Sequence, residues 1–183
     1  MIDAHQFEAF VRTYQDMVFA AAVRLLGNAA EAEDVAQIVF LRAFQRFESI
    51  GSSPAVAGWL RTVTRNVCLN HLSRYRARWR FFSELQPPDS GEAETSYEAA
   101  LPSNRSLDAD MEQAELRERL EHALRALPDH QRVPIVLFHF EQLSYQEISD
   151  LLGVSIGKLK TDIHRGRLAL RPLLTLVPPD AFC

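Results

Sequence analysis

Apolar residues recur every three or four positions along most of this chain, and the pattern fails only between residues 82 and 111. A period of three to four places apolar side chains on one face of an α-helix, whereas a half-buried strand alternates with a period of two. No part of the sequence reads as a run of strands. We therefore predict an all-α protein with two small helical domains, at residues 1–81 and 112–176, and a C-terminal tail at residues 177–183.

The segment between the two predicted domains, residues 82–111, has the composition of a flexible acidic linker. It contains Gln86-Pro-Pro-Asp-Ser-Gly, a further proline at position 102, and mostly acidic and small residues. A chain of roughly 30 residues can extend to about 100 Å. The two domains are therefore expected to be able to act tens of ångströms apart.

The bulk composition excludes several classes of protein. With 47% hydrophobic and 24% charged residues among 183, the chain is ordinary for a soluble protein. No apolar run approaches the roughly 18 residues of a membrane span, and no signal-peptide pattern follows Met1, so we expect a cytoplasmic protein without membrane insertion. The histidines and cysteines lack ligand spacing and no catalytic constellation is visible, so we predict no metal, no cofactor and no enzymatic activity.

The first domain is predicted to begin with two helices. The first runs from Phe7 and ends before Gly27, and Asn28 can cap the second. Apolar residues occupy two sides of the second helix: Val35, Ile38 and Val39 on one, and Phe40, Phe44 and Phe47 on the other. Such a helix either lies deep inside its domain or contacts a partner.

A third helix is predicted from Ala55 to about Trp79, with Ser53 as its N-cap and Pro54 at its first position. Its inward residues are expected to be Val56, Leu60, Val63, Val67 and Leu72.

The second domain is predicted to begin with a helix from Met111 that stops at Pro128, followed by a short apolar helix from Val133 to Phe140. The apolar stripe of the longer helix is Leu116, Leu120, Ala123, Leu124 and Leu127.

A helix-turn-helix is predicted next. Ser144 and Glu147 form a capping box, Gly153 permits a sharp turn, and Ser155 caps the second helix. The residues expected to face inward are Ile148, Leu151, Leu152, Ile156, Leu159 and Ile163.

The outward face of the second helix is basic, with Lys158, Lys160, Thr161, His164, Arg165 and Arg167. Such side chains suit phosphates and base edges in DNA. Two alternatives are a helical hairpin with a merely solvated basic face, and a phosphate loop at Gly153-Val-Ser-Ile-Gly-Lys. The latter is one residue short and follows a helix rather than a strand. Asp162 lies one position off the basic face and is expected to tolerate Asn.

The charge distribution also favours a nucleic-acid partner, although the net charge is −4. Residues 55–80 hold six arginines and no acid, residues 82–112 hold eight acids and one arginine, and residues 152–171 hold five basic residues and one acid. Two basic segments thus flank an acidic one. The alternative is a pair of solvated helix faces.

Several segments together resemble the sigma-70 family. Region 4 of that family is resembled by Leu127-Pro-Asp-His-Gln-Arg-Val-Pro-Ile-Val-Leu, Glu141-Gln-Leu-Ser-Tyr-Gln-Glu-Ile-Ser, Leu152-Gly-Val-Ser and Arg165-Gly-Arg. Region 2.2 is resembled by Glu31-Ala-Glu-Asp-Val-Ala-Gln-Ile-Val-Phe-Leu-Arg-Ala-Phe, and regions 2.3 and 2.4 by Gly58-Trp-Leu-Arg-Thr-Val-Thr-Arg-Asn with Asn70 and the arginines. The lack of an intervening region 3 points to the extracytoplasmic-function (ECF) class.

The resemblance implies a sigma factor that binds core RNA polymerase, directs it to promoters and assists melting. Its implied partners are the coiled coil of the polymerase's largest subunit, the flap region, promoter DNA and an anti-sigma factor. The residues implied to bind core polymerase are Asp34, Gln37, Phe40 and Arg42. For Phe40 and Phe44, burial in the core of the domain is the alternative to contact with the polymerase.

The resemblance also implies two sets of DNA-binding residues. Those for the −10 element are Ser52, Ser53, Arg61, Arg65, Asn66, Asn70, Arg74 and Arg76. Those for the −35 element are Ser155, Gly157, Lys158, Lys160, Thr161, His164, Arg165 and Arg167. Trp59 is expected in the core rather than stacked on a base.

This chain departs from the family pattern at Ile38 and Asn70, where acids are common, and at Asp162 and His164 on the recognition helix. The two alternative classes are an enzyme and a DNA-binding regulator that acts without polymerase. The regulator would normally form a dimer on paired half-sites and would not bind core polymerase.

Overall fold

The structure, a computed structural model, describes residues 4–72 and 107–175, except for the side chains of 107–114 and 174–175. Within these ranges the regular elements are all helices, as the sequence predicts. They are α1 (Ala4–Leu26), α2 (Ala29–Gln45), α3 (Phe47–Ile50), α4 (Val56–His71), α6 (Leu107–Ala126), α7 (Asp129–His139), α8 (Tyr145–Leu152) and α9 (Ile156–Thr175). The predicted linker up to residue 106 and the C-terminal tail lie outside the described residues.

The predicted turn between the first two helices is confirmed. Gly27 adopts a left-handed conformation with φ 71°, and its N–H donates to the carbonyl of Val23 at 2.7 Å. The side chain of Asn28 accepts hydrogen bonds from the backbone N–H groups of Ala30 and Glu31. These two local contacts reverse the chain and set α2 beside α1.

The core of the first domain lies between α1, α2 and α4. On α2 the buried stripe is Ala32, Val35, Val39 and Ala43, which repeats every three or four positions. Ile38, which the sequence places on the same side of the helix as Val35, falls outside that buried stripe and is 40% exposed. Phe7 and Phe10 of α1 pack against the ring of Phe47 at 5.2 and 5.3 Å between centroids.

The third helix begins slightly later than predicted. Ala55, not Ser53, stands at the N-cap of α4, and Pro54 precedes the helix. The hydroxyl of Ser53 instead accepts a hydrogen bond from the N–H of Ala55 at 3.2 Å, which closes a turn before the helix. α4 is described to His71, so its predicted continuation to Trp79 lies outside the described residues.

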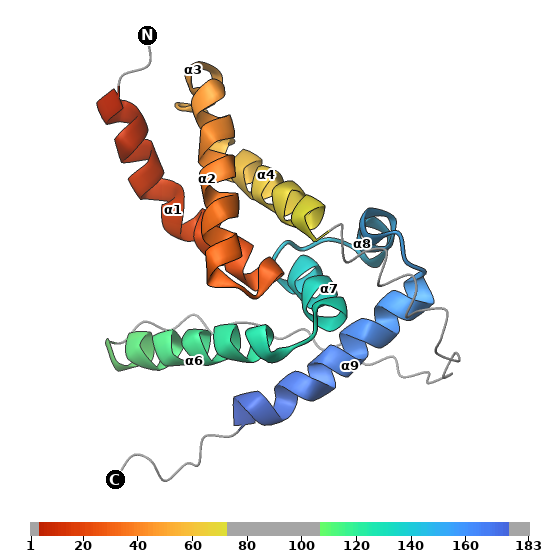
Figure 1. The fold of residues 1–183 in the computed structure, drawn as a ribbon. Coiled ribbons are helices and arrows are strands. Elements are labelled where there is room, and N and C mark those ends of the chain that lie inside the picture. Colours follow the sequence, from red (N-terminus) through yellow and green to blue (C-terminus); the bar gives the residue numbers. More distant parts are fainter. Residues whose placement is uncertain (1–3, 73–106, 176–183) are drawn as a thin grey trace.

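The second domain starts earlier than predicted at both of its first two helices. α6 begins at Leu107 rather than Met111, and α7 begins at Asp129 rather than Val133. In α7 the polar first turn with Asp129 belongs to the helix, because an acidic residue there complements the helix dipole. Leu116 is 54% exposed, contrary to the predicted stripe, since the N-terminal half of α6 projects past the other helices (Figure 1).

The helix-turn-helix of α8 and α9 is confirmed in its local chemistry. Ser144 and Glu147 form the capping box, Gly153 adopts φ 67°, and the hydroxyl of Ser155 accepts from the N–H of Lys158 at 3.3 Å. Ile156 is an exception to the predicted packing, because as the first residue of α9 it lies at the edge of the domain and is 37% exposed.

The close packing of α7 on α9 requires a glycine. A Cβ at Gly166 would overlap the side chain of Ile135 and lie 3.2 Å from Cβ of Gln131. Figure 1 shows α7 lying between the first domain and α9. Both domains therefore contribute to one continuous buried core, with α1 contacting α6 and α7.

Candidate nucleic-acid and polymerase interface

α9 presents its basic face to the outside. Leu159 and Ile163, 0% and 1% exposed, hold the helix against the domain. The exposed residues of the predicted −35 set are Ser155, Gly157, Lys160, His164, Arg165 and Arg167. A Cβ at Gly157 would meet nothing within 4 Å, so the backbone there is open to close approach. Thr161 is half-buried, and its hydroxyl donates to the carbonyl of Gly157 at 3.0 Å.

Lys158 and Asp162 form an ion pair that the sequence did not predict. Asp162 is 6% exposed, and its Oδ2 lies 3.1 Å from Nζ of Lys158. Burial raises the pKa of Asp162, and the charge of Lys158 opposes that shift. The pair lines a small hollow with His130 and Pro134 of α7. Lys158 is therefore directed toward an internal acid, unlike the exposed Lys160 on the same helix.

Arg167 is exposed but lies against α7. Its Nη2 is 3.1 Å from Nε2 of His139, and its guanidinium carbon lies 5.6 Å from the ring centroid of Phe138. Burial lowers the pKa of His139, and the charge of Arg167 lowers it further. A neutral His139 accepts a hydrogen bond from Arg167, and this contact fixes the direction of the arginine.

The predicted −10 residues lie partly on α4 and partly outside the described residues. Arg61, Asn66 and Asn70 are exposed, whereas Arg65 is half-buried. In the loop before α4, Ser52 is exposed and Ser53 is half-buried. Arg74 and Arg76 lie outside the described residues. The half-buried Trp59 packs against the core, as expected.

The exposed face of α2 joins polar and apolar side chains. Asp34, Gln37 and Arg42 of the predicted polymerase-binding set are exposed, while Phe40 is half-buried with its ring 6.5 Å from that of Phe10. Beside them lie three apolar residues outside that predicted set, although partner contact was the expectation weighed against burial for Phe44: Ile38, Leu41 and Phe44, which are 40%, 64% and 44% exposed. Their spacing of three was the available signal.

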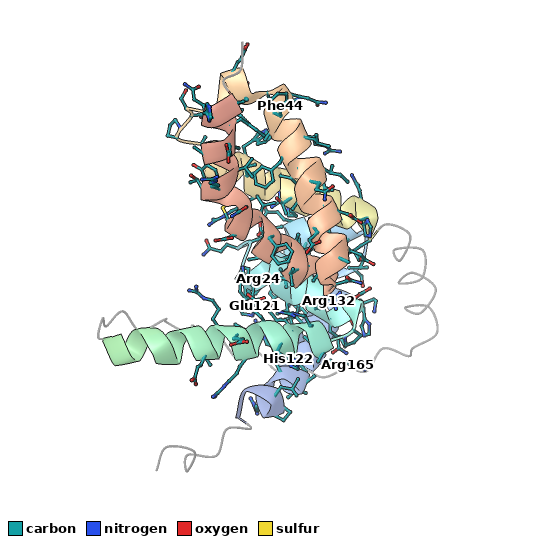
Figure 2. The ribbon with its side chains drawn as sticks, turned by 60° about the vertical axis from the view of Figure 1, so that its left-hand side comes forward. Arg24, Phe44, Glu121, His122, Arg132 and Arg165 are labelled. Carbon is teal, nitrogen blue, oxygen red and sulfur yellow. The ribbon has the colours of Figure 1, made fainter. Side chains whose placement is uncertain are left out.

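Several charged residues missed by the sequence prediction lie where the two domains meet. Arg132 is only 4% exposed, and Arg24 of α1 pairs with Glu121 of α6 at 2.5 Å. Figure 2 shows these three side chains together, with Phe44 at the far end of the first domain. No signal in the sequence relates these residues, because each partner is about 100 positions away along the chain.

A helix-turn-helix with an exposed basic recognition helix defines the class of helix-turn-helix DNA-binding proteins. The family model Sigma-70 region 2 matches residues 10–79, and the model Sigma-70, region 4 matches residues 117–170. The chain belongs to the sigma-70 family of RNA polymerase sigma factors and is of the ECF type. It is a sigma factor, which directs transcription initiation at specific promoters. We call α1–α4 region 2 and α6–α9 region 4.

Two relatives of known family agree with this assignment. The ECF RNA polymerase sigma factor SigW of Bacillus subtilis (strain 168) is 30% identical over 172 residues, which cover 94% of this chain and 90% of SigW. The ECF RNA polymerase sigma factor SigE of Mycolicibacterium smegmatis is 34% identical over 168 residues, covering 92% of this chain but 61% of SigE. A similar solved structure is the sigma factor RpoE in complex with the anti-sigma factor NepR from Bartonella quintana, with a TM-score of 0.47, 23% identity and coverage of 94% and 98%.

The family and the all-α fold that the sequence predicted are thereby confirmed. None of the helices in the described ranges is long and apolar enough to cross a membrane.

Proposed function

We propose that this sigma factor docks on core RNA polymerase through the exposed face of α2 and reads the −35 element with α9. The observation that best supports this division is the contrast between the two faces. The face of α2 adds Ile38, Leu41 and Phe44 to Asp34 and Gln37, a mixture that suits a protein partner.

The face of α9 suits DNA. Lys160 and Arg165 provide charge for phosphates and guanine edges, and His164 lies beside them on the same exposed face. The Lys158–Asp162 ion pair makes Lys158 a weaker DNA ligand than its position on the helix suggests. We assign base reading to Lys160, Thr161, His164 and Arg165, and backbone contacts to Ser155, Gly157, Lys158 and Arg167.

For the −10 element we propose that the arginines of α4 hold the strand and that Asn66 and Asn70 bind unstacked bases. Single strands are bound by a basic groove together with groups that recognise unpaired bases. Arg61 and the exposed asparagines fit that description on one helix.

Further partners follow from the same function. The exposed Leu168 and Leu173 of α9, 50% and 41% exposed, suit the polymerase flap region. An anti-sigma factor is supported by the sequence resemblance. A cytoplasmic location without catalytic activity follows because polymerase and promoter DNA are found there and the family consists of transcription initiation factors.

The test is binding to core polymerase without DNA, followed by transcription in vitro. We expect the chain to bind core enzyme and to start transcripts from a subset of genomic fragments. Asp34→Lys should weaken core binding, because it reverses a charge in the docking face. Asp16→Lys, the same change on an exposed position of α1, is the matched control. A chain that binds promoter fragments but not core polymerase would be a regulator of another kind.

A further inference from the structure

Arg167 of α9 lies against a group of side chains that α7 and α8 contribute. Its Nη2 is 3.1 Å from Nε2 of His139, the last residue of α7, and its guanidinium carbon lies 5.6 Å from the ring centroid of Phe138. The ring of Phe138 stacks on that of Tyr145, the first residue of α8, with centroids 4.8 Å apart and planes inclined by 12°. We call His139, Phe138 and Tyr145 the arginine platform. Figure 1 shows the three helices that it joins, α7, α8 and α9, packed against one another.

The hydrogen bond to His139 fixes one end of the guanidinium. A guanidinium only donates, so Nε2 of His139 accepts and the ring proton is on Nδ1. Burial lowers the pKa of His139, and the charge of Arg167 lowers it further. The imidazole is therefore neutral at neutral pH and keeps a lone pair for the arginine.

The ring of Phe138 provides a second contact for the same guanidinium. A cation within about 6 Å of a ring centroid is attracted by the negative face of the ring. Phe138 is itself held in place, because it stacks on Tyr145 and meets the ring of His139 at 4.9 Å and 90°. Arg167 thus loses side-chain freedom when the domain folds rather than when it binds a ligand.

Arg167 shares a helix face with Lys160 and His164, which precede it by seven and three positions. At 1.5 Å per residue it lies about 10 Å from Lys160 along the axis of α9. The N-terminal residues of a recognition helix contact base edges, in a major groove about 12 Å wide. Arg167 is therefore placed to meet the phosphate backbone at the edge of the groove, a step that rests on the proposed function.

The guanidinium keeps donors for a phosphate while it contacts His139. It has five N–H groups in a planar arrangement, and His139 takes a hydrogen bond from Nη2. The side chain of Arg167 is exposed, so its other donors are accessible. An arginine that is already ordered binds a phosphate oxygen pair with a smaller loss of entropy than a freely rotating one.

We propose that His139 is a positioning residue for −35 binding, which together with Phe138 directs the guanidinium of Arg167 toward a DNA phosphate. His139 does not contact the DNA and acts only through Arg167. Loss of this ordering lowers promoter affinity about fivefold, which corresponds to about 1 kcal/mol for one long side chain. The number of phosphate contacts is unchanged, because an arginine released from the platform still reaches the phosphate.

The test uses holoenzyme reconstituted from the full chain and core polymerase, on a promoter fragment that the parent transcribes. His139→Leu removes the acceptor, whereas His139→Gln supplies an amide oxygen that accepts in its place. Each is made alone and together with Arg167→Ala. His122→Leu, at an exposed histidine of α6, is the matched control. Affinity is measured over a series of salt concentrations at about pH 8, where the imidazoles are neutral.

Arg167→Ala should lower the affinity and reduce the slope of log affinity against log salt concentration by about 0.9, as expected for one lost phosphate contact. His139→Leu should lower the affinity about fivefold with an unchanged slope, and His139→Gln should recover most of the loss. His122→Leu should behave as the parent. In the Arg167→Ala background, His139→Leu should have no further effect, because the residue through which it acts is absent.

Three results overturn the proposal. An unchanged affinity in His139→Leu removes the positioning role. An equal loss in the Arg167→Ala background makes His139 a structural residue of α7, and a reduced salt slope in His139→Leu makes it a phosphate ligand itself.

Lys160→Ala is measured in parallel to separate this proposal from the proposed function. If Lys160→Ala lowers the affinity while any of the three results is obtained, α9 still binds the promoter and only the role of His139 is wrong. If neither Lys160→Ala nor Arg167→Ala changes the affinity, α9 does not bind the promoter, and the proposed function fails together with the role of His139.

Discussion

Region 2 and region 4 are both built from helices, yet α2 of region 2 and the N-terminal half of α9 in region 4 leave opposite chemistry exposed. Region 2 exposes Ile38, Leu41 and Phe44 along α2, whereas region 4 exposes Lys160 and Arg165 along α9. An exposed apolar stripe is stabilised by a protein partner, and a basic stripe by a polyanion. The contrast teaches that the class of partner follows from the side chains that remain exposed on each helix once its other face is buried in the core.

The two regions also differ in what holds them together. Region 2 has an aromatic cluster, in which Phe7 contacts Phe10, Phe44 and Phe47 with centroids 4.9 to 5.8 Å apart. The helix-turn-helix of region 4 depends on a few aliphatic side chains and on capping contacts at both helix starts. Region 4 should therefore be the more sensitive region to loss of a single core side chain.

The largest expected effect tests that difference in sensitivity. Leu159→Ala removes a side chain that is 0% exposed and should cost about 2–5 kcal/mol of stability. Hydrogen exchange should accelerate in α6–α9 and much less in α1–α4, with Leu168→Ala, at a 50% exposed position, as the control. Equal acceleration in both regions would show that they unfold as one unit, and region 4 would then not be the more sensitive region.

The next effect concerns the apolar face of α2. Leu41→Asp introduces a charge at a residue that is 64% exposed, so the fold should persist. Affinity for core polymerase should fall about 30-fold, which is about 2 kcal/mol, as expected for a central interface residue. Leu116→Asp on α6, at a 54% exposed leucine, should leave the affinity nearly unchanged. The measurement is competition binding to core polymerase. If both variants lose the same affinity, α2 has no special role in docking.

A smaller effect separates base reading from backbone binding on α9. Arg165→Ala should relax the preference at one or two −35 positions by about tenfold, because a base-edge contact discriminates by ~1–3 kcal/mol. Lys158→Ala should lower transcription from all promoters by the same factor. That factor should be less than tenfold, since Nζ of Lys158 is already paired with Asp162 at 3.1 Å. The measurement is transcription from a library randomised at the −35 element. If Arg165→Ala lowers transcription from every promoter by the same factor, Arg165 contacts the phosphate backbone rather than a base.

The smallest effect is the pH dependence of the capping box. Hydrogen bonds from the backbone and side chain of Ser144, and more weakly the charge of Arg65, lower the pKa of Glu147. A lowered pKa in the folded state contributes stability above about pH 4.3, and that contribution is lost as the pH falls through the lowered pKa. The protection of the α8 amides against hydrogen exchange, taken relative to the intrinsic rate at each pH, should therefore fall in acid, and Glu147→Gln should remove that component. An identical acid profile in Glu147→Gln would contradict the assignment.

The sequence predicted the features that depend on neighbours along the chain. Gly27, Asn28, Ser144 and Gly153 act on backbone groups within a few residues, so their roles follow from residue type and spacing. The helix starts at Leu107 and Asp129 were missed because apolar periodicity does not include a polar first turn. For the site, the same periodicity correctly placed Lys160, His164 and Arg165 on the exposed side of α9.

By itself, the sequence determined the helical class, the helix-turn-helix and the sigma-70 family, because these depend on local periodicity, capping and an ordered set of motifs. Only the tertiary structure decided which charged groups became buried. Asp162 is covered because α7 packs behind α9, and Arg132 is covered because α1 ends against α7. Such contacts join residues distant along the chain, so no local pattern records them, and they decide whether a charge faces DNA, another domain or an internal partner.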